Sequence, residues 1–353
     1  MNIEERIKSF ALFGETLRKS LNNNLDVSVG NGRDRSLLRI LIDTQVNRNP
    51  WFTPENVRRA IAAIAYELTE ENLIKWTSTY NGINDEGNPL RVAVIMAGNI
   101  PLAGFHDFLS VLITGNKLIA KTSSKDSELL LVITSILCKI NPEFKERIEF
   151  TDSTLTNFDA VIATGSDNSS RYFDYYFGKY PNIIRKNRNS IAILEGDETD
   201  EEMQGLGTDI FSYFGLGCRN VSKIYIPEGF DLKRHSKKWD NFHDIVNHTK
   251  YSNNYDFNKA VYIVNKENFH DTGYLLMKED IRISSPVSVL YFEYYGSQDA
   301  VKQVPELLKE KIQCVIGKHY IPFGQAQCPH LWDYADGIDT IEFLLKKKIA
   351  GIL

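Results

Sequence analysis

The chain of 353 residues has few of the residues that build metal centres and disulfide frameworks. Its four cysteines include no CxxC pair, and its seven histidines include no HExxH motif. This spacing excludes the usual zinc sites and disulfide scaffolds, so we expect no metal and take the reducing cytoplasm as the location. No apolar run reaches the ~20 residues that span a bilayer, and we therefore expect no membrane span.

The chain also carries no excess of positively charged residues. Lys and Arg number 41 against 46 Asp and Glu, which gives a formal net charge of -5. We therefore do not expect nucleic acid or an anionic membrane surface as a partner. Hydrophobic residues make up 42% and charged residues 25% of the chain, as in an ordinary globular protein long enough for two domains.

The glycine fingerprint of classical dinucleotide-binding domains is absent. Gly205-Leu206-Gly207 and Gly215-Leu216-Gly217 begin like G-x-G-x-x-G, but both lack the third glycine and neither follows a predicted strand. A dinucleotide would therefore have to be held by other residues.

The pattern that is present alternates strands with helices. Residues 1–80 predict helices, and the buried strands and helices that follow predict a parallel sheet covered on both faces. Such sheets bind ligands at the carboxyl ends of their strands. The aromatic cluster 172–180 predicts a helix that packs its rings into the core. Strands are predicted at 92–96, 117–121, 160–164, 190–194, 221–227, near 261–264, 287–293 and 313–316, and further helices at 101–114, 128–140 and 200–215.

One cysteine has the surroundings of a nucleophile. Cys218 lies between a predicted helix and a predicted strand, and two glycines precede it, which leaves room for a substrate carbonyl. Arg219 places a positive charge beside the thiol, which favours the reactive thiolate. Covalent catalysis is one interpretation. The alternative is a buried cysteine that acts as a small hydrophobic residue.

Asn99 has two interpretations of its own. It follows the strand predicted at 92–96 and precedes Pro101, which fixes the entry to a helix. Its amide could donate a hydrogen bond to a developing oxyanion. Alternatively, its side chain caps the helix that follows.

Taken in order, several segments resemble the aldehyde dehydrogenase superfamily. Within it, the stretch around Cys218 is most similar to the LuxC-type acyl-CoA reductases, and the resemblance covers roughly residues 90–350. The segments that carry it are Ile95-Met-Ala-Gly-Asn-Ile-Pro-Leu102, Thr114-Gly-Asn116, Ile119-Ala-Lys121, Thr164-Gly-Ser166, Gly215-Leu-Gly-Cys-Arg-Asn-Val-Ser-Lys223, Ser285-Pro-Val287 and Pro322-Phe-Gly324.

The resemblance implies an α/β fold of two Rossmann-like domains with the active site between them. Residues 1–194 would form the cofactor-binding domain with its helical N-terminal region. Residues 195–353 would form the catalytic domain, with the last residues returning to the first. Cys218 would be the nucleophile and Asn99 the oxyanion donor. The implied cofactor-binding residues are Met96, Ala97, Lys121, Ser124, Gly165 and Ser166.

Two departures from the family pattern refine the expected chemistry. The segment 183–187, where hydrolytic aldehyde dehydrogenases carry a general-base glutamate, contains no carboxylate, although Glu195 or Asp197 could substitute. Where NAD-preferring members carry a glutamate, this chain has Ser124 with Lys125 beside it, which favours NADPH over NADH. A second family glutamate is replaced by Arg282.

The resemblance therefore implies NADPH-dependent reduction of a fatty acyl thioester to an aldehyde through a cysteine acyl-enzyme. The acyl donor would be an acyl-CoA or an acyl-protein thioester. A homo-oligomer and an acyl-protein synthetase partner are expected with it. Two alternatives stay open: an NAD(P)-dependent aldehyde dehydrogenase that forms a carboxylic acid, and a non-catalytic subunit that carries acyl chains.

Overall fold

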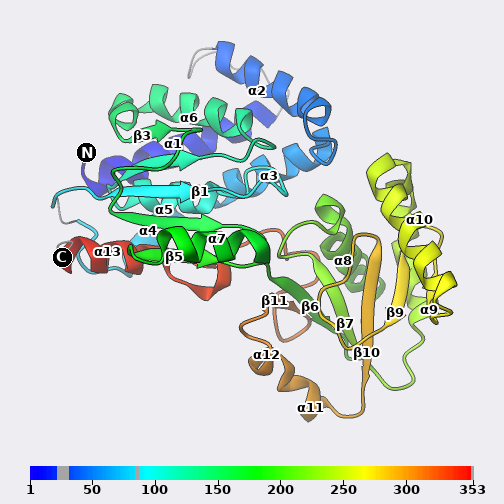
Figure 1. Cartoon of the computed structure of the whole chain (residues 1–353). Coiled ribbons are helices and arrows are strands. Elements are labelled where there is room, and N and C mark those ends of the chain that lie inside the picture. Colours follow the sequence, from blue (N-terminus) through cyan, green and yellow to red (C-terminus); the bar gives the residue numbers. More distant parts are fainter. Residues whose placement is uncertain (22–31, 85–86, 351–353) are drawn as a thin grey trace. The chain divides into compact units, whose positions relative to one another are not determined.

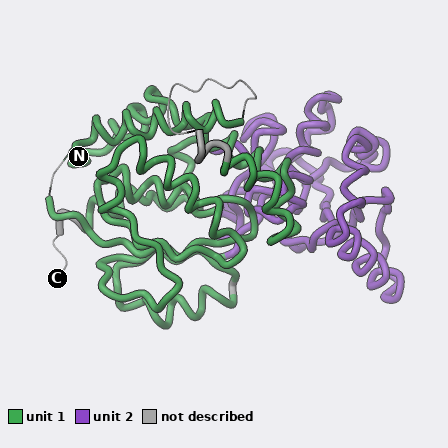
Figure 2. The backbone as a smooth tube through the Cα atoms, turned by 90° about the horizontal axis from the view of Figure 1, so that it is seen from above, with its two compact units in different colours: residues 1–186, 330–353 green, residues 187–329 purple. Residues whose placement is uncertain are grey.

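The computed structural model describes residues 1–21, 32–84 and 87–350, which divide into two compact units (Figure 2). Unit 1 comprises residues 1–186 and 330–353, and unit 2 comprises residues 187–329. The boundary falls eight residues before the one expected at 194. The strand β6 (Asn189–Ile193) pairs with two strands of unit 2, so it belongs to that sheet.

Unit 1 is built on a five-stranded parallel sheet (Figure 1). The strand order is β3-β2-β1-β4-β5, so the order reverses next to β1, as in doubly wound folds. The strands are β1 (Arg91–Ile95), β2 (Lys117–Lys121), β3 (Ile148–Phe150), β4 (Ala160–Thr164) and β5 (Asn182–Arg185).

Helices cover both faces of this sheet. Val92 and Val94 point into a large core shared with α1, α5 and α6, whereas Ala93 points to the opposite face, which α7 covers. This burial on both faces explains the continuous apolar run of β1. The helices of unit 1 are α1 (Ile3–Leu21), α2 (Gly32–Thr44), α3 (Pro54–Glu67), α4 (Glu70–Thr77), α5 (Phe105–Ile113), α6 (Glu128–Ile140), α7 (Asp167–Phe177) and α13 (Thr340–Ala350).

Unit 2 is built on a six-stranded sheet in the order β11-β6-β7-β10-β9-β8, in which only the β8–β9 pairing is antiparallel. Its further strands are β7 (Val221–Pro227), β8 (His270–Asp271), β9 (Leu276–Glu279), β10 (Val289–Tyr295) and β11 (Ile312–Ile316). Its helices are α8 (Asp200–Phe211), α9 (Leu232–His235), α10 (Thr249–Val264), α11 (Gln298–Lys302) and α12 (Val304–Leu307).

No described helix has both the length and the apolarity needed to cross a bilayer. Short 3-10 segments complete the described elements. These segments are η1 (Gln45–Asn47), η2 (Pro142–Glu146), η3 (Ser212–Gly215), η4 (Ser236–Asn247) and η5 (Ala335–Gly337).

Four details of the sequence prediction were wrong. Residues 261–264, expected as a strand, end helix α10, which His248 caps and which buries Tyr255 and Tyr262 seven residues apart, or two turns. The helix expected from residue 101 begins at Phe105. The helix expected to run to residue 215 ends at Phe211. In the cluster at 172–180, the rings of Tyr172, Tyr175 and Tyr176 are exposed rather than packed in the core.

Candidate active site

One group of candidate site residues lies at the carboxyl ends of β1, β2 and β4 in unit 1. We call this the cofactor edge and define it as residues 96–99, 121–126 and 165–166. It stands beside the reversal in strand order, where open α/β sheets bind their ligands. All six predicted cofactor-binding residues of the sequence analysis belong to it.

Asn99 is exposed at this edge and does not cap α5. The helix begins six residues after it, and its N-cap is Gly104. The capping interpretation is therefore wrong. Gly98 is needed beside Asn99, because a Cβ there would lie 2.4 Å from Ser123 Oγ. The loop after β1 consequently rests directly on the loop after β2.

The predicted cofactor-binding residues differ in what they present. Ser124 and Lys125 are exposed at the turn after β2, and Lys121 Nζ donates to the carbonyl of Ser153 at 2.9 Å. Ser166 caps α7 by accepting the Ser169 N–H, next to the positive end of that helix. Met96 is buried, and its N–H donates to the Lys121 carbonyl at 3.0 Å.

A buried carboxylate that the sequence analysis did not identify connects two loops of the cofactor edge. Asp126 Oδ2 accepts the N–H of Leu102 at 2.6 Å, and Leu102 adopts a left-handed conformation with φ of 58°. Burial raises the pKa of Asp126 from 3.8 to about 7. The folded state therefore holds this proton more tightly than the unfolded state, and the resulting stabilisation is lost as the pH rises through 7.

Replacing Asp126 by asparagine should remove that pH dependence. The amide oxygen can still accept the Leu102 N–H, and no charge needs to be buried at high pH. The gain in free energy of unfolding over wild type should be larger at pH 8 than at pH 5, by on the order of 2–4 kcal/mol. Urea denaturation at the two pH values measures it. An equal difference at both values would show that Asp126 does not titrate in this range.

A separate group of candidate site residues is the turn that carries Cys218, in unit 2. Cys218 and Cys314 are half-buried, whereas Cys138 is buried and Cys328 exposed. The buried-hydrophobe interpretation therefore describes Cys138 rather than Cys218. Cys218 lies three residues before β7, near the amino end of that strand.

Three consecutive residues with left-handed backbone conformations lead into the Cys218 turn. Tyr213, Phe214 and Gly215 have φ of 51°, 59° and 75°, and the first two carry side chains in a conformation that costs of order 1 kcal/mol or more each. The ring of Phe214 packs against His248 at a centroid distance of 4.3 Å, which helps to offset that cost. This left-handed stretch ends the predicted helix early and turns the chain toward Cys218.

The side chain of Asn220 stabilises the Cys218 turn through hydrogen bonds. Its buried side chain accepts the Gly217 N–H at 2.8 Å and donates to the carbonyls of Asp209 and Ser212 at 3.0 and 2.8 Å. Because the amide both accepts and donates, neither an aspartate nor a leucine could replace all of these bonds. The side chain thus joins the turn to the end of α8.

Ser190, on β6, contacts the same turn from the neighbouring strand. Its hydroxyl donates to the Cys218 carbonyl at 2.9 Å and lies 3.0 Å from Cys314 Sγ. Arg219 directs its Nε to the carbonyl of Ala326. The charge that the sequence analysis placed beside the thiol is therefore anchored by the segment that follows β11.

Glu195 and Asp197 lie at the opposite end of the sheet from Cys218. Ser190, near the amino end of β6, contacts Cys218, and Glu195 follows the carboxyl end of the same strand. Five residues of extended strand place Ser190 and Glu195 roughly 16 Å apart. Glu195 pairs with His319 at 3.3 Å and Asp197 with Lys318 at 2.8 Å. Their suggested role as the base is therefore wrong.

Arg282 also has a local partner. Its guanidinium binds the Asp280 carboxylate through Nε and Nη2 and lies 5.0 Å from the centre of the Tyr291 ring. Arg282 holds the pKa of Asp280 well below its usual range. This pair accounts for the arginine without a role in catalysis.

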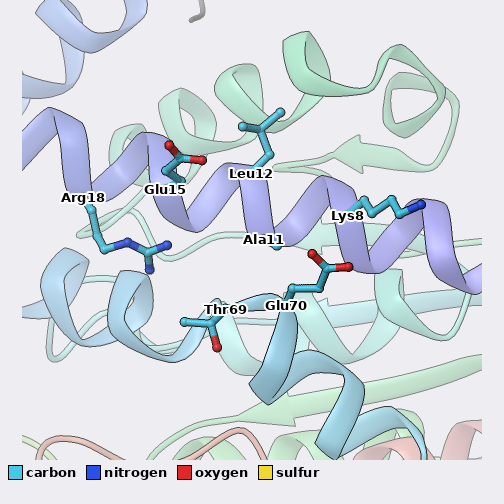
Figure 3. Close-up of a pocket in the computed structure, with 7 residues that line it drawn as sticks. All are labelled: Lys8, Ala11, Leu12, Glu15, Arg18, Thr69 and Glu70. Atoms are coloured by element: carbon cyan, nitrogen blue, oxygen red, sulfur yellow. The ribbon is translucent and has the colours of Figure 1, made fainter. Parts of the chain in front are cut away.

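A surface hollow of about 350 Å³ lies in unit 1 between α1 and the start of α4, away from the cofactor edge (Figure 3). Two of its charged residues have local partners, since Glu15 pairs with Lys19 and Arg18 donates to the Ala65 carbonyl. No feature of this hollow matches the predicted chemistry. It is lined by Lys8, Ala11, Leu12, Glu15, Arg18, Thr69 and Glu70.

Comparison with known families identifies the family of the chain. The profile of the family described as Acyl-CoA reductase (LuxC) matches residues 20–285, which is most of the chain. The chain belongs to this family. The resemblance found in the sequence is thereby confirmed.

Individual relatives agree with the family assignment. The chain is 26% identical over 214 residues to a long-chain acyl-protein thioester reductase of Aliivibrio fischeri, and 24% identical over 155 residues to a second reductase of this name from Photobacterium leiognathi. These matches cover 55% and 39% of this chain. They cover 44% and 32% of the relatives, so the chain matches less than half of their length.

Solved structures confirm the fold. Aldehyde dehydrogenase 21 from Physcomitrella patens, solved with succinate, superposes with a TM-score of 0.67 over 99% of this chain and 85% of its own, at 12% identity. An aldehyde dehydrogenase from Mycobacterium tuberculosis, solved with NAD+, gives a TM-score of 0.58 over 85% and 70% of the two chains, at 14% identity. The chain has the aldehyde dehydrogenase fold.

Proposed function

We propose that this protein reduces a fatty acyl thioester to an aldehyde with NADPH, through an acyl group carried on Cys218. The observation that supports this most is the Cys218 turn. Asn220 and Ser190 hold its backbone in place, while its thiol stays half-buried rather than packed in the core. Membership of the acyl-CoA reductase family supports the same chemistry.

In the proposed reaction, the Cys218 thiolate attacks the carbonyl carbon of the thioester and forms a tetrahedral oxyanion. The backbone N–H of Cys218 and the side-chain amide of Asn99 stabilise that oxyanion. The C–S bond to the leaving thiol then breaks, and the acyl group remains on Cys218. After reduction, the Cys218 thiohemiacetal collapses to aldehyde and free thiolate.

The cofactor edge fits a dinucleotide phosphate. Its loops pack closely at Gly98, and the turn after β2 exposes Ser124 and Lys125 with no carboxylate at either position. Lys121, Ser124, Gly165 and Ser166 would hold NADPH, with Met96 and Ala97 contributing backbone. Bound NADPH supplies the hydride that converts the acyl group to the aldehyde oxidation level.

The lack of a carboxylate in the segment 183–187 favours thioester chemistry over hydrolysis. Arg185, in the segment where hydrolytic relatives carry glutamate, is buried and paired with Asp107 and Thr340 in unit 1. Glu195 and Asp197 are remote from Cys218. If none of these groups activates water, an acyl group on Cys218 persists and exchanges with a second thiol.

The names of the relatives suggest the acyl donor. We propose a long-chain acyl group delivered as an acyl-protein or acyl-CoA thioester, with an acyl-protein synthetase as the partner that supplies it. We also propose a homo-oligomer.

The reverse reaction tests this proposal with simple reagents. Purified protein is given a long-chain aldehyde and NADP+, with and without coenzyme A. We expect repeated turnover to NADPH only when the thiol is present, with acyl-CoA as the product, and no more than about one NADPH per protein without it, because the acyl group then stays on Cys218. Equal rates without thiol, together with free fatty acid, would contradict the proposal and support an acid-forming dehydrogenase. Failure to bind nicotinamide cofactor at all would support a non-catalytic subunit.

A further inference from the structure

We propose that Asp209 is a positioning residue for Cys218 and acts through the segment 322–326, an inference that rests on the proposed role of Cys218 as the nucleophile. Asp209 lies on α8 and is fully buried. Its Oδ2 accepts the N–H of Gly324 at 2.7 Å, and its Oδ1 accepts the N–H of Ala326 at 3.0 Å. One carboxylate therefore fixes two peptide groups of a segment more than a hundred residues further along the chain.

Ala326 connects Asp209 to the Cys218 turn through two hydrogen bonds. Its N–H is bound to Asp209, and its carbonyl accepts the Nε of Arg219, the residue next to Cys218. The turn is thus held by α8 twice. Asn220 binds the carbonyls at the end of the helix, and Arg219 binds the segment that Asp209 anchors.

Close packing at Gly205 supports the same contact. A Cβ at Gly205 would lie 2.8 Å from the carbonyl carbon of Phe323 and 3.1 Å from the nitrogen of Gly324. Glycine weakens a helix interior, so its place in α8 indicates a packing requirement. The Gly205-Leu206-Gly207 motif, which failed as a dinucleotide fingerprint, is explained in part by this approach of the segment 322–326 to the helix.

The contact needs a carboxylate in its ionised form. Each N–H binds a different oxygen of Asp209, and protonation turns one of these oxygens into a donor and a weak acceptor, whereas an amide replaces it by an NH2 group that cannot accept. Burial raises the pKa of Asp209 to about 7, and the neighbouring Arg219 acts in the opposite direction. Among the described residues, the charged side chain that faces the Asp209 carboxylate is Arg219, which lies on the Cys218 turn. One of the two bonds should therefore be lost as the pH falls below 7.

The test compares Asp209→Asn and Gly205→Ala with two matched variants of the same helix. Asp200→Asn removes an exposed carboxylate that pairs with Lys238 in the first turn. Gly207→Ala adds the same methyl group against the rings of Phe242 and Trp239 instead of the segment 322–326. Hydrogen exchange of the full-length protein and the rate of Cys218 acylation by a long-chain acyl-CoA are measured for all four.

We expect both test variants to speed amide exchange in the segments 322–326 and 216–220 at least about tenfold, and to slow acylation of the folded protein by a similar factor. Wild-type acylation should fall below pH 7 more steeply than alkylation of Cys218 by iodoacetamide, which reports the thiolate alone. In Asp209→Asn, the pH profile of acylation should coincide with the pH profile of alkylation by iodoacetamide. The matched variants should leave exchange at 216–220 and the acylation rate within about threefold of wild type.

Two results separate the failure of this inference from the failure of the proposed function. Faster exchange at 322–326 with unchanged exchange at 216–220 would overturn the role of Asp209, whatever the activity. Coupled exchange in a wild-type protein that acyl-CoA does not acylate would instead overturn the proposed function, while the positional coupling would stand.

Discussion

Replacement of Cys218 by alanine should abolish the reduction of acyl thioesters, lowering kcat/KM by at least about 1000-fold, as expected when the nucleophile of a covalent mechanism is removed. The fold should survive, because Ser190 bonds to the Cys218 carbonyl and Asn220 to the Gly217 N–H, both backbone groups. Steady-state assays of NADPH consumption with a long-chain acyl-CoA measure the loss.

The other cysteines provide the controls. Cys328→Ala changes an exposed thiol outside the Cys218 turn, and Cys314→Ser changes the half-buried thiol next to Ser190. We expect Cys328→Ala to retain activity within about twofold and Cys314→Ser to lose less than about tenfold. A Cys218→Ala protein with a tenth or more of wild-type turnover would show that another group carries the acyl chain or that none does.

Replacement of Ser124 by glutamate should invert the cofactor preference. A carboxylate at this exposed turn would repel a 2′-phosphate and would accept hydrogen bonds from the ribose hydroxyls of NADH. Juxtaposed like charges cost several kcal/mol, so the ratio of kcat/KM for NADPH to that for NADH should fall on the order of 100-fold. Fluorescence titration with each cofactor should show the same change in Kd.

Ser124→Gln is the matched control, because it adds the same bulk without the charge. Its cofactor ratio should stay within about threefold of wild type. If Ser124→Glu leaves the ratio unchanged while Ser124→Gln behaves as wild type, the 2′-phosphate does not lie beside this turn. If both variants lose all binding, the turn contributes shape rather than charge.

The sheet of unit 1 could be predicted from the sequence because both of its faces are buried. The central residues of β1, β2 and β4 are apolar and buried, and each strand is followed by small polar residues, so the cofactor edge could be located without coordinates. The family resemblance then identified the residues at this edge. Local pattern and fold agree in these strands, which is why their positions could be predicted, whereas the cofactor-binding roles of the residues at this edge stay predictions.

Predictions failed where the deciding contact is distant in sequence or where local propensity misleads. Residues 261–264 are mostly β-branched, yet they complete a helix that packs on β9 and β10 through Tyr255 and Tyr262. The end of α8 depends on left-handed residues that carry side chains, which sequence alone does not indicate. The domain boundary depends on which strands pair with β6.

The supporting carboxylates could not be found by pattern at all. Asp126 contacts a residue 24 positions earlier, and Asp209 contacts residues 115 and 117 positions later. Neither stands in a motif, and an aspartate in a helix is ordinarily expected at the surface. Their roles become visible only when the backbone groups that they accept from are placed beside them.

Mass spectrometry of the protein after incubation with a long-chain acyl-CoA, without any nicotinamide cofactor, tests the central claim most directly. We predict that one acyl group attaches through a thioester, that peptide mapping places it on Cys218, and that adding NADPH removes it with release of aldehyde. An acyl group on Cys314 or Cys328, or an unmodified Cys218 in a protein that still reduces acyl-CoA, would contradict this account.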